Sequence, residues 1–129
     1  MKLTTPRNGR EFAIPDDWWS FAEMNLFHPC ETFYPYRPKC TGSIDIVSLK
    51  GIEPPIRDPG IAEFKKYKLV SVLLAFHSPE CALPPVQVER LTAPNNYQYR
   101  IHNGYHRFYA SVAAGYSELP IVVIERGAF

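Results

Sequence analysis

Prolines interrupt this chain of 129 residues at thirteen positions, and eight of these positions lie in residues 1–60. Proline fixes φ and lacks an amide hydrogen, so inside a helix or a central strand it breaks the hydrogen bonding of that element. We therefore expect sparse regular structure in the first half of the chain and denser structure in the second half. A chain of this length can bury one hydrophobic core. We predict two regions of one unit, residues 1–42 and residues 43–129.

The charges of the chain are nearly balanced, with fourteen Lys and Arg against thirteen Asp and Glu and a net charge of +1. Extended binding to nucleic acid needs a surplus of cations that face many phosphates, so the balance argues against it and leaves room only for a local basic pocket. The N-terminus lacks a secretory signal, and the longest mostly apolar run, residues 69–76, is far shorter than a membrane span. We expect a cytoplasmic protein without a membrane segment.

Three cysteines, Cys30, Cys40 and Cys81, form no CxxC pair, and an odd number cannot all be bridged. We predict buried free thiols and no metal site. A zinc site formed by His28, Cys30 and Cys40 is the alternative, but structural zinc usually has four ligands in closer pairs.

One helix is predicted in the first region, over residues 16–27, because Pro15 and two aspartates form an N-terminal signal and apolar residues then recur at helical spacing. The following residues 30–40 are rich in tyrosine and proline. We expect an ordered loop there, packed through its rings, with a ligand platform as the alternative. The aromatic content of this region also makes it a candidate surface for a protein partner.

The second region predicts the element order β, α, ββ, α, β from its alternating and helical patterns. Strands are predicted over residues 44–49, 86–91, 97–102 and 120–124, and helices over residues 61–76 and 105–114. The middle two strands form a hairpin, and residues 53–60 form a proline-rich loop. We predict an α+β fold in which helices pack on a small mixed sheet, preceded by an N-terminal extension of helix and loop.

The junction between the strand 97–102 and the helix 105–114 is the strongest candidate for a binding site. Asn103 is the predicted N-cap, and Gly104 lets another group come close to the backbone. The first amides of the helix would then point outward beside His106 and Arg107, and such amides favour an oxyanion. The alternative is that Arg107 pairs with an acidic side chain and that His106 caps the helix.

Residues 44–125 resemble the ParB/sulfiredoxin superfamily, and their spacing is most similar to that of sulfiredoxin. The resemblance is carried by the motifs Leu-Pro-Pro-Val-Gln-Val at 83–88, Tyr-Gln-Tyr at 97–99, Gly-Tyr-His-Arg at 104–107 and Leu-Pro at 119–120. It implies a ParB/sulfiredoxin-like fold that binds the phosphates of ATP or another nucleoside triphosphate, with Mg²⁺ bridging phosphate oxygens.

The resemblance also implies which residues contact the nucleotide. His106 and Arg107 match the phosphate-binding pair of sulfiredoxin, and Lys68 and Ser71 match phosphate contacts on the preceding helix. Together Lys68, His106 and Arg107 would neutralise phosphate charge, while the amides of residues 103–105 orient the phosphates. Arg57 lies in a loop that matches another nucleotide-contacting arginine.

Two departures from the superfamily bear on the reaction. Tyr105 replaces the catalytic cysteine of sulfiredoxin, and a phenol cannot form the thiosulfinate link, so sulfinic acid reductase activity is not expected. The free serine kinases of the superfamily carry Asp-Gly-x-His-Arg and a glutamate base after the first strand. Here Asn103 replaces the aspartate, and Glu53 stands in the comparable loop. Glu53 is the candidate catalytic base, with a solvated loop charge as the alternative.

Three hypotheses of function follow. The first is a domain that binds nucleotide phosphates, ATP before other nucleotides, with transfer of a phosphoryl group to a small molecule as its reaction. The second is a non-catalytic adaptor or regulatory module of the same fold. The third is a ParB-like nuclease, which needs a divalent metal and for which the sequence offers no carboxylate cluster at ligand spacing.

Overall fold

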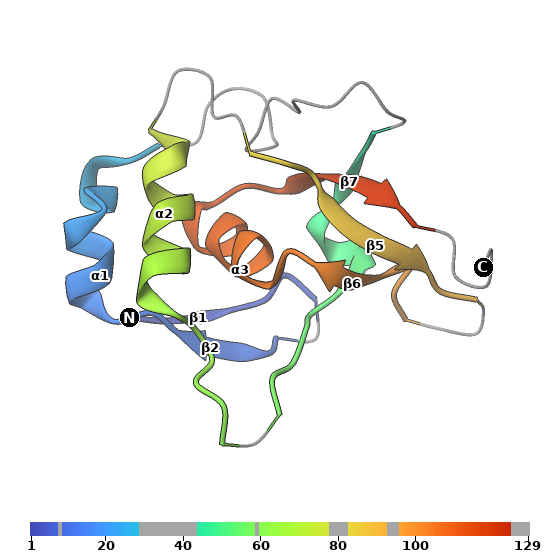
Figure 1. The fold of residues 1–129 in the computed structure, drawn as a ribbon, viewed down its shortest axis with the longest axis horizontal. Helices are drawn as coiled ribbons and strands as arrows, with labels where there is room; N and C mark the ends of the chain where they lie inside the picture. Colours follow the sequence, from blue (N-terminus) through green and yellow to red (C-terminus); the bar gives the residue numbers. More distant parts are fainter. Residues whose placement is uncertain (8, 29–43, 59, 78–82, 93–95, 125–129) are drawn as a thin grey trace.

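A computed structural model describes residues 1–7, 9–28, 44–58, 60–77, 83–92 and 96–124. In these ranges the α-helices are α1 (Asp16–Phe21), α2 (Lys66–Phe76) and α3 (Tyr105–Ala114). Figure 1 shows α2 between α1 and α3, with the larger of two sheets on the other side of α3. The predicted α+β class with helices packed on a small mixed sheet is confirmed.

The larger sheet has the strand order β3-β7-β5-β6-β4. Its strands are β3 (Asp45–Ser48), β4 (Ile52–Glu53), β5 (Val86–Arg90), β6 (Tyr99–Asn103) and β7 (Glu118–Val123). The sheet is mixed, because β5 runs antiparallel to β6 but parallel to β7. The antiparallel β5–β6 pair confirms the predicted hairpin, whereas the short strand β4, parallel to β6, lies partly where a loop was predicted.

The first region contains a hairpin that the sequence pattern did not predict, formed by β1 (Lys2–Thr4) and β2 (Glu11–Ala13). The predicted helix over residues 16–27 is wrong in its second half, because α1 ends at Phe21 and a 3₁₀ turn follows at Met24–Leu26. Glu23 interrupts the helix with a left-handed φ of 57°, a conformation that an α-helix does not accept.

Several predictions for this half of the chain lie outside the described residues. These are the loop over residues 30–40, the boundary at residue 42, and the thiols of Cys30, Cys40 and Cys81. None of the helices in the described ranges is long and apolar enough to cross a membrane.

The helix predicted over residues 61–76 starts only at Lys66, after an N-cap, Lys65, in extended conformation. Tertiary packing explains the shorter helix. The ring of Phe64, 7% exposed, lies edge-on to Phe12 and Tyr109 at centroid distances of 6.2 and 5.4 Å. Burying this ring outweighs the weak helical preference of the segment.

One hydrophobic core joins the two regions of the chain. Its buried residues include Val86 and Val88 of β5, Leu119 and Ile121 of β7, Phe108 and Tyr109 of α3, Leu69 and Leu73 of α2, and Phe12 and Ile14 of the first region. Helix α3 is therefore held from both sides, by the sheet and by α2, and its first turn has a fixed position.

The chain turns from β6 into α3 at Gly104, whose φ of 132° is open to glycine but not to other residues without strain. A Cβ atom there would lie 2.7 and 2.9 Å from the two Cγ atoms of Val86, which is fully buried. Gly104 is the N-cap, and no side chain caps the helix. The predicted Asn103 cap is therefore wrong, because Asn103 is the last residue of β6.

We predict that Gly104→Ala destabilises the protein by about 3 kcal/mol, because it adds both backbone strain and a clash with Val86. Urea unfolding measures the change. Gly9→Ala is the matched control, because Gly9 has a φ of 57° but no atom within 4 Å of the added Cβ; it should cost about 1 kcal/mol. Equal losses in the two variants would contradict a role for the close contact.

Candidate functional site

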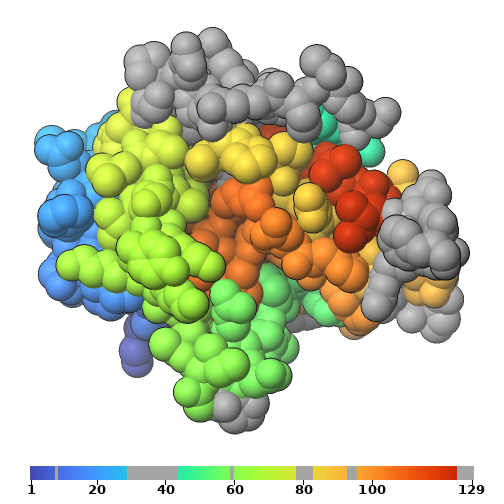
Figure 2. Space-filling model, viewed as in Figure 1, coloured from blue at the N-terminus to red at the C-terminus, as the bar shows by residue number. Residues whose placement is uncertain are grey.

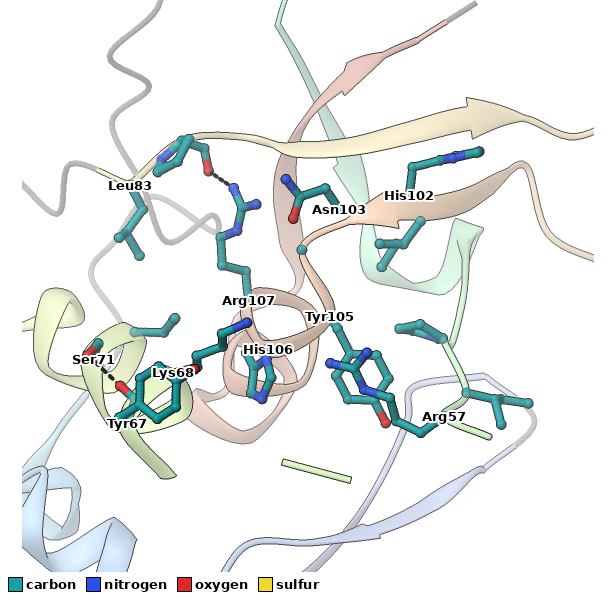
Figure 3. A pocket seen from close by; sticks show the side chains of 16 residues that line it. Arg57, Tyr67, Lys68, Ser71, Leu83, His102, Asn103, Tyr105, His106 and Arg107 are labelled. Atoms are coloured by element: carbon teal, nitrogen blue, oxygen red, sulfur yellow. Dashed lines mark hydrogen bonds between the residues drawn. The ribbon is translucent and has the colours of Figure 1, made fainter. Parts of the chain in front are cut away.

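A pocket of about 700 Å³ opens where β6 passes into α3 (Figure 3). Its walls come from the segment after β4, from α2 and from the β6–α3 corner. In the space-filling view, the orange residues of β6 and α3 border the yellow-green α2 on one side and the green segment after β4 below (Figure 2). The structure brings all seven predicted binding residues to this pocket: Lys68, Ser71, Asn103, Gly104, Tyr105, His106 and Arg107. Their binding role stays a prediction.

Basic side chains reach the pocket from three separate segments. Arg57 follows β4, Lys68 lies on α2, and Arg107 lies in the first turn of α3, whereas none of the described residues in the lining is Asp or Glu. Nη1 of Arg107 donates to the carbonyl oxygens of Pro84 and Pro85, the second at 2.8 Å. This arrangement creates a positive potential in a concave space, which favours an anion.

The first turn of α3 adds backbone donors to the same wall. The first intrahelical bond of α3 runs from the amide of Phe108 to the carbonyl of Gly104, so the amides of residues 105–107 precede the helical hydrogen-bond pattern. By contrast, the hydroxyl of Ser71 donates to the carbonyl of Tyr67 at 2.5 Å. Ser71 would have to rotate before it could donate to a ligand.

His106 is buried, with 8% exposure, and its Nε2 accepts a hydrogen bond from the backbone N–H of Lys65 at 3.0 Å. The neutral ring must then carry its proton on Nδ1. Burial lowers the pKa of His106 to about 4, and the positive charges of Arg57 and Lys68 add to this shift. The ring is therefore neutral at pH 7 without ligand, and in this state it offers an N–H donor. The neutralisation of phosphate charge by His106 stays a prediction.

We predict that His106 makes the protein less stable in acid. The ring takes up its proton near pH 6.5 in the unfolded chain but only near pH 4 in the folded protein. The contribution of the neutral ring to the free energy of unfolding is therefore fully present above pH 6.5 and is lost as the pH falls from 6.5 to 4. The loss between about pH 7 and about pH 5 is expected to be about 2 kcal/mol.

Urea unfolding at both pH values checks this prediction. In His106→Gln, the side-chain oxygen can still accept from the amide of Lys65, but nothing titrates. The variant should show a smaller loss of stability in acid than the wild type. The same loss in both proteins would show that other groups cause it.

Tyr105, the first residue of α3, contributes an aromatic ring with a phenol hydroxyl. Burial raises the pKa of Tyr105 to about 12, and the charge of Glu63 acts in the same direction. The phenol is therefore protonated and donates to Oε1 of Glu63 at 3.4 Å. The guanidinium of Arg57 lies over the ring, with Cζ 4.0 Å from its centroid. Spacing in the sequence did not indicate either contact, since the partners are more than forty residues apart.

Glu53, the candidate catalytic base, is not among the described residues that line the pocket. It lies at the end of β4, where its two carboxylate oxygens accept from Nε and Nη2 of Arg100 at 3.0 and 3.4 Å. His102 does line the pocket, and its Nε2 is 3.1 Å from Oε1 of Glu89. The catalytic role of Glu53 stays a prediction.

The described residues contain no cluster of three or more His, Cys, Asp and Glu that could hold a metal ion. In the pocket itself, the oxygen atoms that could act as metal ligands belong to backbone carbonyls and to the side chains of Tyr67, Ser71, Asn103 and Tyr105. A divalent cation in this space would need most of its ligands from a bound anion and water.

Neither a protein-family model nor a curated protein matches the chain. Among solved structures, it is similar to the C-terminally truncated chromosome-partitioning protein ParB from Caulobacter crescentus, crystallised with CTP-γ-S. The TM-score is 0.51 at 21% sequence identity, and the match covers 67% of this chain and 47% of the ParB chain. This chain thus matches about half of the ParB chain. The fold is ParB-like, while the finer relation to sulfiredoxin stays a prediction.

Proposed function

We propose that the pocket binds the phosphates of a nucleoside triphosphate. The supporting observation is the convergence of basic side chains from three segments and the first amides of α3 on one cavity without a carboxylate among its described lining residues. A volume of about 700 Å³ suits a ligand of nucleotide size. The ParB-like neighbour, crystallised with CTP-γ-S, adds support to this proposal.

Each group has a stated task in the proposal. Arg57, Lys68 and Arg107 balance the charge of the phosphates, and the amides of residues 105–107 orient the phosphate oxygens. His106 donates from Nδ1, because its Nε2 already accepts from Lys65. All these groups are donors, which is what a phosphate chain requires.

The contacts to the phosphates do not select the nucleotide base, which would be recognised by other residues. The resemblance to sulfiredoxin favours ATP, whereas the ParB-like neighbour holds a cytidine nucleotide. Phosphates are common to both, so ATP and CTP are compared in the same experiment. Mg²⁺ would be held by the phosphate oxygens themselves, since no described lining residue is a carboxylate.

The proposed function is binding without catalysis. A phosphotransferase needs a base beside the hydroxyl that it activates, but Glu53 is held by Arg100 and lies outside the described lining. A binding domain that acts through its nucleotide-bound state needs no such base. Such a domain would combine nucleotide binding with the role of a regulatory module.

We predict that isothermal titration detects binding of ATP or CTP in the presence of Mg²⁺, and that Lys68→Met weakens it about tenfold by removing a charge-assisted contact. Lys66→Met is the matched control. Lys66 lies on the same helix, but its Nζ is over the ring of Phe21, 5.4 Å from the centroid, and it does not line the pocket. Its affinity should be unchanged. No heat from either nucleotide would overturn the proposed function.

Glu53→Gln separates binding from the predicted reaction. We expect its nucleotide affinity to stay within about twofold of the wild type, because Glu53 pairs with Arg100 at the protein surface, where such pairs contribute little. The same titration measures it. A loss of about tenfold or more would show that Glu53 belongs to the binding site after all.

A further inference from the structure

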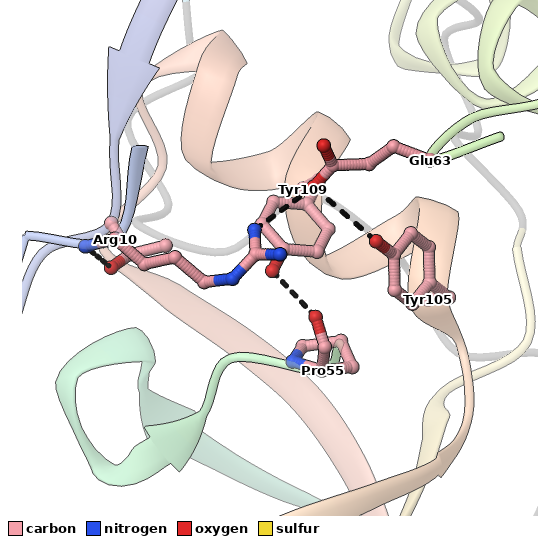
Figure 4. Close-up of polar contacts among 6 residues, drawn as sticks. Arg10, Pro55, Glu63, Tyr105 and Tyr109 are labelled. Carbon is pink, nitrogen blue, oxygen red and sulfur yellow. Dashed lines mark hydrogen bonds and ion pairs between the residues drawn. The ribbon is translucent and has the colours of Figure 1, made fainter. Parts of the chain in front are cut away.

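A chain of side-chain contacts leads from the β1–β2 hairpin to Tyr105 (Figure 4), and from there to the pocket. Nη1 of Arg10, the residue before β2, donates to Oε1 of Glu63 at 2.9 Å. The phenol of Tyr105 donates to the same oxygen at 3.4 Å. On the ring of Tyr105 lies the guanidinium of Arg57, which lines the pocket. Residues from three parts of the chain that are far apart in the sequence thus meet in one series of contacts.

The ring of Tyr105 is a rigid support within this series. Its centroid lies 5.1 Å from that of Tyr109 and 5.9 Å from that of Phe64, both of which are buried. Tyr109 is itself held, because its hydroxyl donates to the carbonyl of Pro55 at 2.6 Å, two residues before Arg57. The hydrogen bond of the phenol to Glu63 opposes a swing of the whole side chain about χ1, and the packing against Tyr109 and Phe64 holds the face of the ring.

Arg57 needs such a support more than the other basic residues of the pocket. It follows the short strand β4 in a segment without helix or strand, whereas Lys68 and Arg107 lie on helices. A free arginine side chain loses much rotamer freedom when it binds a ligand, and a guanidinium that already stacks on a ring loses less. Its charge already acts on the pocket wall, because it contributes to the lowered pKa of His106.

We propose that Tyr105 is a positioning residue that holds Arg57 in the orientation that binds phosphate, and that the β1–β2 hairpin sets the affinity of the pocket through Arg10 and Glu63. This inference rests on the proposed function, because it assigns the phosphates to Arg57. It adds a regulatory route, since a ligand or partner that displaces the hairpin would weaken nucleotide binding without touching the pocket. The N-terminal region would then set the affinity of the pocket in addition to packing against the core.

The first test is a double-mutant cycle on Arg57 and Tyr105, with ATP, CTP and inorganic triphosphate as probes in titration calorimetry. Arg57→Ala should weaken binding about tenfold, and Tyr105→Leu about fivefold. In the Arg57→Ala background, Tyr105→Leu should add less than about twofold, because its effect passes through Arg57. Inorganic triphosphate should give the same pattern, since the coupling concerns phosphates and no base.

Tyr67→Leu is the matched control for this cycle. Tyr67 also lines the pocket, but it lies on α2 and is 66% exposed. Its effect on affinity, whatever its size, should be the same with and without Arg57. If the wild type binds nucleotide and the losses of affinity in Arg57→Ala and Tyr105→Leu are additive in the double variant, the inference is overturned and the proposed function stays intact. A wild type that binds none of the probes would overturn both.

The second test concerns the hairpin and keeps the ring in place. Arg10→Met and Tyr105→Phe should each weaken triphosphate binding about two- to threefold, and the double variant should be no weaker than either alone. Thermal unfolding of each variant checks that it is folded at the temperature of the titration. An Arg10→Met protein that is folded and binds with unchanged affinity would overturn the link to the hairpin.

A readout that needs no nucleotide checks the contact itself. A side chain 4.0 Å from the centre of an aromatic ring lies in its ring current, so the NMR signal of the Arg57 Nε–H group should be shifted upfield in the free protein. The shift should persist in Tyr105→Phe and disappear in Tyr105→Leu. An unshifted signal in the wild type would overturn the positioning role of the ring, whatever the affinities.

Discussion

The close contact between Gly104 and Val86 is the constraint on which the pocket depends. A hydrogen atom in place of a side chain lets the β6–α3 corner lie against β5, at a site where a Cβ atom would meet Val86 at 2.7 Å. The positive φ of Gly104 then turns the chain so that the first amides of α3 and the side chain of Arg107 share one wall of the cavity. A larger residue would push the helix from the sheet and displace the whole wall.

The groups on that wall differ in burial and therefore in charge. Arg57 and Arg107 are partly exposed, Lys68 is exposed, and all three bring positive charge. The buried His106 stays neutral because burial and the charges of Arg57 and Lys68 oppose its protonation. A neutral imidazole still donates one hydrogen bond. The half-buried Tyr105 stays a phenol for a similar reason and provides a ring for Arg57 to lie on. The pocket thus combines hydrogen-bond donors on buried elements with charges that water can still reach.

Patterns in the sequence predicted the elements whose signals are local. Helix α3 has the predicted bounds, because a glycine stands at each end and both glycines adopt a positive φ. The β5–β6 hairpin follows from alternating residues on each side of a loop. The strands β1, β2 and β4 escaped prediction because two or three residues are too few to show a period, and their hydrogen bonds go to partners elsewhere in the chain.

By itself, the sequence determined the mixed α+β fold and the group of residues that gather at the β6–α3 corner, since the five consecutive positions 103–107 and one face of α2 bring them there. Only the tertiary structure decided which contacts these residues make. Three contacts join residues more than forty positions apart: the neutral ring of His106 with the amide of Lys65, Glu53 with Arg100, and Arg57 with the ring of Tyr105. Such contacts depend on how the elements pack, and no local pattern carries that information.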